Sequence, residues 1–209
     1  MKKTFIIWLL AIDLFFVVLH LFFGANYDIF NLDRERTPAA LWSSFQLVGC
    51  AFALAVIFFP QRQSVQKIAW GAATLLFTLL SFDEISELHE NVAYYLVKYF
   101  QPFPFLRSGT PMWIVFLSPL ILASLSLLAL IIKKLFQYRR SLGWLASSGC
   151  LFFLCALTLE FVGGIKSLYA YLPLFVVLEE GSELVAGSLF FFSFATYAKE
   201  CFSASYRRI

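Results

Sequence analysis

Two short acidic motifs carry the side chains of this chain that could do chemistry. The first reads Asp83-Glu84-Ile85-Ser86-Glu87-Leu88 and the second reads Glu179-Glu180-Gly181-Ser182-Glu183-Leu184, so both follow the pattern acid-Glu-x-Ser-Glu-Leu. Each motif lies inside a long apolar stretch and contains a Glu-x-x-Glu pair. Carboxylate oxygens are the ligands that Mg²⁺, Ca²⁺ and Mn²⁺ prefer, and helices with paired Glu-x-x-Glu residues can bridge two ions. The motifs therefore predict a divalent-metal site.

Helix geometry extends this predicted site to neighbouring residues. At about 100° per residue, the acids of each motif, with Glu90, fall on one face of their helix. Counted from the helix ends, they lie in the outer half of a membrane, as does Glu160. His89 falls near 240° on its helical wheel, about opposite the acids, and is a packing residue unless the helix has partners on both sides. The candidate ligands are Asp83, Glu84, Glu87, His89, Glu90, Glu160, Glu179, Glu180 and Glu183.

These acids need compensation, because one ionisable group at the bilayer centre costs at least about 2.5–3.5 kcal/mol. No Lys or Arg lies within the two acidic stretches. Three interpretations follow: bound divalent metal (Mg, Ca, Mn or Fe, with Zn also allowed), protonated carboxylates that form a proton relay, or a hydrated vestibule that opens outward. No catalytic residue is assigned. The motifs for nucleotide-binding loops and for a serine nucleophile are absent from the sequence, so no organic cofactor is predicted.

The composition places these motifs in a lipid bilayer. The 209 residues are 61% hydrophobic and 14% charged, with a mean hydropathy of +0.80. A soluble domain carries about 25% charged residues, so a soluble globular protein is excluded, as is a disordered one. A nucleic-acid partner is not expected, because no basic face occurs. The chain is predicted to be a single transmembrane domain, residues 1–209.

Six apolar runs are long enough to cross a membrane of about 30 Å as helices. They cover residues 4–23, 41–59, 67–98, 111–132, 143–162 and 173–198. Pro119 lies inside the fourth run and should kink it. Lys and Arg gather in the connections on the side of the two termini, above all between Lys133 and Arg140. This bias predicts a multi-pass protein of the inner (cell) membrane with both termini in the cytoplasm.

The two motifs also predict an internal repeat. They match between the third and sixth runs, so the halves, about 1–100 and 108–209, would hold three helices each. Because three is odd, the second half enters the membrane in the opposite sense. The expected fold is all-α, with six transmembrane helices as two inverted repeats and the site between them. Gly187, on the acidic face, should admit a neighbouring backbone.

A resemblance to a known family supports the same candidate residues. Ser81-Phe82-Asp83-Glu84 followed by His89-Glu90 resembles the Asp-Glu-x4-His-Glu signature of small, poorly characterised bacterial multi-pass membrane proteins. The second motif, with Gly187, is similar to their second acidic motif. The resemblance implies a site but no reaction, and its residues are Asp83, Glu84, His89, Glu90, Glu179, Glu180 and Glu183. The plan is also similar to inverted-repeat cation transporters that carry an acidic motif in each half.

The expected function is that of a cation transporter or exporter, because two equivalent half-sites suit alternating access. In this hypothesis Glu84, Glu87, Glu180 and Glu183 ligate the ion, and the other acids assist. An alternative is a membrane-embedded metalloenzyme acting on a lipid or small apolar substrate, with His89 or a carboxylate as base. A third is a sensor or assembly subunit whose acids bind a partner. The sequence leaves open the metal, the substrate, the direction of transport and the oligomeric state, a homo-oligomer included.

Overall fold

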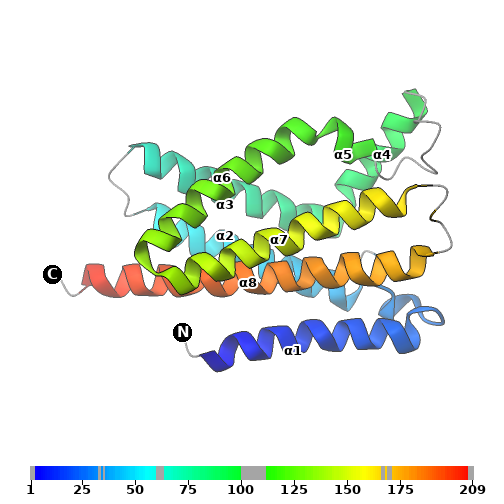
Figure 1. The fold of residues 1–209 in the computed structure, drawn as a ribbon, viewed down its shortest axis with the longest axis horizontal. Helices are drawn as coiled ribbons and strands as arrows, with labels where there is room; N and C mark the ends of the chain where they lie inside the picture. The colour runs from blue at the N-terminus through cyan, green and yellow to red at the C-terminus, as the bar shows by residue number, and fades with distance from the viewer. Residues whose placement is uncertain are drawn as a thin grey trace.

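The computed structural model describes residues 3–32, 34, 36–59, 64–99, 112–165, 168 and 171–206. The regular elements of this part of the chain are helices (Figure 1), which confirms the predicted all-α class. A π-helical turn and a 3-10 turn follow the first helix, at His20–Gly24 and Asp28–Phe30. The α-helices are α1 (Lys3–Leu19), α2 (Pro38–Phe58), α3 (Ser64–Ser86), α4 (Leu88–Tyr99), α5 (Met112–Phe116), α6 (Ser118–Tyr138), α7 (Arg140–Gly163) and α8 (Leu172–Tyr206).

Within the part of the chain that the structure describes, five helical segments are long and apolar enough to cross a membrane, which is compatible with a membrane protein. They are Thr4–Gly24, Pro38–Phe58, Val65–Ser86, Ser118–Tyr138 and Arg140–Gly163. The sixth predicted run is part of α8, a helix of 35 residues whose first half carries the second acidic motif. Helix α8 is not among these five candidate spans.

The long helices run in alternate directions along one bundle. Both termini therefore lie at one end, and the two acidic motifs lie toward the other (Figure 1). Helix α8 packs against α7, α2 and α1, whereas α3 packs mainly against α2. Thr37 starts α2 by accepting a hydrogen bond from the backbone N–H of Ala40 at 3.3 Å, and Pro38 occupies the first turn.

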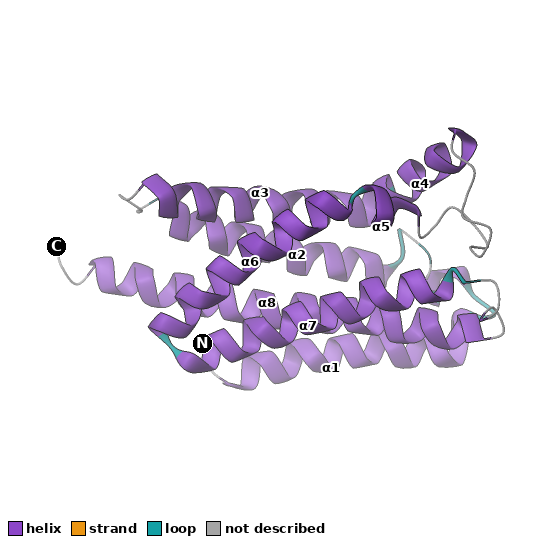
Figure 2. Ribbon diagram, turned by 45° about the horizontal axis from the view of Figure 1, so that its top comes forward, coloured by secondary structure: helices purple, strands orange, loops and turns teal. Residues whose placement is uncertain are grey.

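The third predicted helix is not continuous, so the prediction of one helix over 67–98 was wrong. Glu87 adopts a left-handed backbone with φ of 55°, which ends α3 at Ser86. Helix α4 then leaves the line of α3 (Figure 2). Asp83 stabilises the new start, because its carboxylate accepts the backbone N–H of His89 at 2.9 Å and so caps α4.

The connections around α6 also differ from the prediction. The expected kink at Pro119 is a break at Leu117, with Pro119 in the first turn of α6. Proline has no backbone N–H to donate and is tolerated there. Lys133 and Lys134 were expected in a basic connection, but both lie within α6. Arg139 alone separates α6 from α7.

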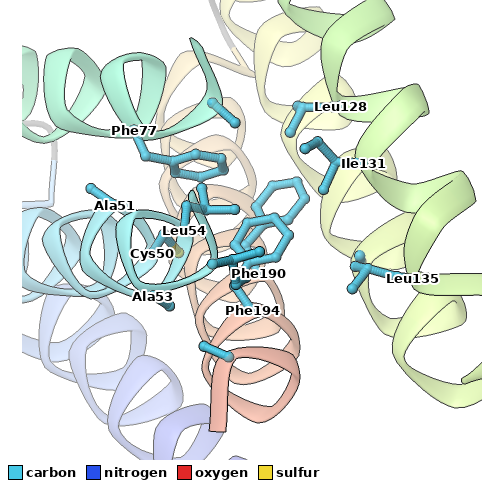
Figure 3. Close-up of a cluster of buried hydrophobic side chains, with 14 of the residues drawn as sticks. Cys50, Ala51, Ala53, Leu54, Phe77, Leu128, Ile131, Leu135, Phe190 and Phe194 are labelled. Atoms are coloured by element: carbon cyan, nitrogen blue, oxygen red, sulfur yellow. The ribbon is translucent and has the colours of Figure 1, made fainter. Parts of the chain in front are cut away.

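Apolar side chains fill the half of the bundle that lies toward the termini (Figure 3). Phe77 of α3 meets Phe190 and Phe194 of α8 edge-on, with ring centroids 5.5 Å apart in both pairs. Leu54 of α2 and Ile131 of α6 belong to the same cluster, and each residue is at most 1% exposed. This half of the bundle is a packed, mostly apolar core, in which Ser193 and Thr196 are also buried.

Candidate carboxylate site

Three of the predicted acids line one small cavity at the end of the bundle away from the termini. Glu84 comes from α3, whereas Glu180 and Glu183 come from successive turns of α8. The cavity has room for about one water molecule, about 10 Å³. Short side chains of α2 leave this space for the carboxylates. The remaining lining residues are Leu32, Ala39, Ala40, Ser43 and Leu184.

The segment between α1 and α2 covers this cavity. Leu32 of this segment lines the cavity. Its surface is only 6% exposed, and its side chain packs with Ala39 and Leu184. The backbone N–H of Leu32 donates to Nδ1 of His20 at 3.0 Å, which ties the cover to the end of the first helical segment. Gly24 makes this approach possible, because a Cβ there would lie 2.5 Å from that same nitrogen. His20 thus acts as an anchor of the cover.

A second group of predicted residues forms a chain of contacts beside the cavity. Oδ2 of Asp83 lies 2.9 Å from Nδ1 of His89. The His89 ring packs on the indole of Trp113, with centroids 5.1 Å apart. The Trp113 Nε1–H donates to Glu160 Oε1 at 2.5 Å. These four residues belong to α3, α4, α5 and α7, so the two helix breaks bring them together.

His89 supplies positive charge to this acidic neighbourhood. It lies beyond the candidate span that ends at Ser86. Burial by itself lowers the pKa of His89, but the hydrogen bond and charge of Asp83, with the charges of Glu160 and Glu183, outweigh burial and raise that pKa to about 9. His89 is therefore a cation at neutral pH, paired with Asp83. The prediction that it points away from the acids was wrong, because the helical wheel ran through the break at Glu87.

The remaining predicted site residues are placed less centrally. Glu179 lies close enough to Glu183 for their charges to interact, but it is not among the lining residues of the cavity. Glu87 is not among them either, and its backbone forms the turn that ends α3. Its carbonyl accepts the Asn91 side-chain amide at 2.7 Å. The side chain of Glu90 lies outside the described residues. The acidic face predicted for the first motif therefore divides at the helix break.

The described residues contain no group of three His, Cys, Asp or Glu side chains that could hold a metal ion as they stand. Glu84, Glu180 and Glu183 share the cavity without converging to ligand distances. The residues that could take up a cation are these three, provided that α3 and α8 approach further.

A buried polar node, Asp13 with Trp42, Gln46 and Ser188, was missed as a site by sequence reasoning. Asp13 is 1% exposed and accepts hydrogen bonds from all three partners. The sequence feature that could have identified this node is Asp13, a single acid in the middle of a very apolar helix. Gly187 admits this node, since a Cβ there would lie 2.3 Å from Gln46 Oε1. The predicted close approach at Gly187 therefore involves a side chain rather than a backbone.

Comparison with known proteins gives the chain a family. It belongs to the family described as a domain of unknown function, DUF8692, whose model matches residues 6–198. No curated protein and no solved structure matches the chain. The matched range contains both acidic motifs, the polar node and the packed apolar core.

Proposed function

We propose that this chain is an inner-membrane cation transporter with six crossing helices and both termini in the cytoplasm. Its substrate in this proposal is a divalent metal ion that enters the cavity of Glu84, Glu180 and Glu183. The observation that carries the proposal is the shared cavity, because it joins carboxylates from both motifs on two different helices. The long α8 is the sixth crossing helix.

The chemistry of the cavity supports a hard divalent cation. Three carboxylates can present up to three negative charges, and oxygen ligands suit Mg²⁺, Ca²⁺ or Mn²⁺. The ring of His89 supplies one positive charge nearby, paired with Asp83. Space for about one water molecule fits a bare ion better than a lipid or small apolar substrate. The size therefore favours transport over the metalloenzyme alternative.

The distribution of polar and apolar side chains supports alternating access. The carboxylate cavity lies toward one end of the bundle, and the Phe77–Phe190–Phe194 cluster closes the other half. In addition, the two matching motifs have different backbones. α3 breaks at Glu87, whereas α8 stays helical through the equivalent Glu183. Alternating access moves one repeat against the other, and a difference between the two motifs fits such a cycle.

Metal binding by the purified protein tests this proposal. We expect about one Mn²⁺ per chain in detergent, and its loss in the variant Glu84→Gln/Glu180→Gln. Glu87→Gln is the matched control, because Glu87 belongs to the same motif but does not line the cavity. Wild-type protein that binds no divalent ion, or a double variant that binds as well as the control, would contradict the proposal.

A further inference from the structure

We propose that Asp13 is a proton-binding site inside the bundle, distinct from the carboxylate cavity. Its carboxylate is held by three hydrogen bonds from two other helices. Trp42 Nε1–H and Gln46 Nε2–H donate to Oδ1, each at 2.8 Å, and the Ser188 hydroxyl donates to Oδ2 at 2.6 Å. Gln46 Nε2–H also donates to Ser188 Oγ at 2.9 Å. These contacts fix α1 against α2 and α8 around one titratable group.

The site lies deeper in the bundle than the carboxylate cavity. Ser188 follows Glu183 by five residues on α8, which is about 7.5 Å along the helix axis. Gln46 follows Ser43 by three residues on α2, which is about 4.5 Å. Ser188, the partner of Asp13 on α8, is therefore more than one helical turn along that helix from Glu183.

The three hydrogen-bond donors that the described residues provide to Asp13 carry no charge that could compensate an ionised carboxylate. From α2 they are the indole of Trp42 and the amide of Gln46, and from α8 the hydroxyl of Ser188. On these packed elements, Glu183 is the first titratable group toward the cavity, and on α1 it is His20. A buried charge without a partner is costly in an apolar medium, and a proton bound at the carboxylate removes that cost.

The hydroxyl of Ser188 can reorient when Asp13 binds this proton. Three other serines of α8 donate to the backbone carbonyl four residues earlier: Ser182, Ser193 and Ser203. Ser188 donates instead to Asp13, which leaves the Leu184 carbonyl as its alternative acceptor. A rotation of one hydroxyl hydrogen therefore changes Ser188 from a donor to an acceptor toward Asp13.

Both protonation states fit the same positions of the heavy atoms. In the ionised state, Ser188 donates to Oδ2. When a proton arrives, an O–H bond forms at Oδ2 and donates to Ser188 Oγ, while the Ser188 hydrogen turns to the Leu184 carbonyl. Oδ1 keeps its donors, Trp42 and Gln46, and becomes the carbonyl oxygen of the acid. The balanced step is the addition of one proton to the carboxylate, without other bonds being broken.

This inference does not depend on metal binding at the cavity, so it can be tested with a chelator present. Infrared spectroscopy detects the C=O stretch of a protonated carboxylic acid apart from that of an ionised one. We expect such a band to disappear as the pH rises over about 4 to 10, and to be missing in Asp13→Asn. Glu183→Gln should keep this band.

A second variant identifies the band and keeps the test valid if Asp13→Asn does not fold. Trp42→Phe removes one donor from the carbonyl oxygen Oδ1, so the band should move to higher wavenumber. Trp8→Phe is its control, because Trp8 is 67% exposed. A carboxylic-acid band that is insensitive to both Asp13→Asn and Trp42→Phe, or an Asp13 band that does not change with pH, would overturn the inference.

Discussion

Asp83 holds His89 at two atoms across the break at Glu87: one carboxylate oxygen accepts its backbone N–H, and the other lies 2.9 Å from its ring Nδ1. The first bond satisfies a free donor at the start of α4, and a negative charge is favourable at that end of a helix. The second bond turns the ring toward Trp113. One side chain thus ends one helix, caps the next and orients a cation beside the carboxylate cavity.

The pairing predicts a stability that falls in alkaline solution. Folding raises the pKa of His89 from 6.5 to about 9. The pairing is therefore fully stabilising below about pH 6.5 and is lost as the pH rises through about 9. We expect thermal unfolding in detergent to show a loss of up to about 3 kcal/mol between these limits. His89→Gln should lack this component, and an unchanged pH profile in that variant would contradict the assignment.

Gly187 should be intolerant of a side chain. Its Cβ would lie 2.3 Å from Gln46 Oε1, and the Gln46 amide is held in place by Asp13 and Ser188. Gly187→Ala should therefore destabilise the fold by about 1–3 kcal/mol. In Gly181→Ala on the same helix, the added methyl meets Val17 at 3.4 Å, and about 0.5–1 kcal/mol of stabilisation is expected. Melting temperatures of the two variants should move in opposite directions.

Trp113 should stabilise the site through its ring nitrogen. Trp113→Phe keeps an aromatic ring against His89 but removes the donor to Glu160, which should cost about 1–3 kcal/mol. Trp144→Phe serves as the reference, since Trp144 is 66% exposed and should be nearly neutral. Equal melting temperatures for the two variants would remove the proposed link between α5 and α7.

The apolar core should depend strongly on Phe194. This side chain is fully buried and contacts Phe77 and Phe190. Phe194→Ala should therefore cost about 3–5 kcal/mol in the free energy of unfolding. Phe52 lies on α2 with 71% of its surface exposed, and Phe52→Ala should change stability far less. Chemical denaturation of both variants in the same detergent measures the difference.

The acidic motifs could be predicted because carboxylates inside apolar stretches are rare and expensive. That signal suffices to find Glu84, Glu180 and Glu183. The break at Glu87 could not be predicted, because neither Gly nor Pro occurs in the local sequence Ile85-Ser86-Glu87-Leu88. The bond that caps the helix after the break joins the carboxylate of Asp83 to a residue six positions later.

The polar node lay beyond sequence reasoning for a related reason. Asp13 is conspicuous as an acid in α1, but its partners come from α2 and α8, and only the packing of these helices brings them together. The need for glycine at position 187 likewise follows only from the structure, in which the Gln46 side chain lies against it. The position of an acid can be read directly from the sequence, whereas the pairing of distant helices cannot.

Ion flux is the measurement that tests the central claim most directly. Proteoliposomes that contain an Mn²⁺-sensitive dye should show uptake with the wild-type protein and with Glu87→Gln. Uptake should fall to the level of empty liposomes with Glu183→Gln, because Glu183 lines the cavity and Glu87 does not. If the wild-type protein carries no divalent ion, or if Glu183→Gln carries it as fast as the wild type, the proposed transport through this carboxylate cavity is contradicted.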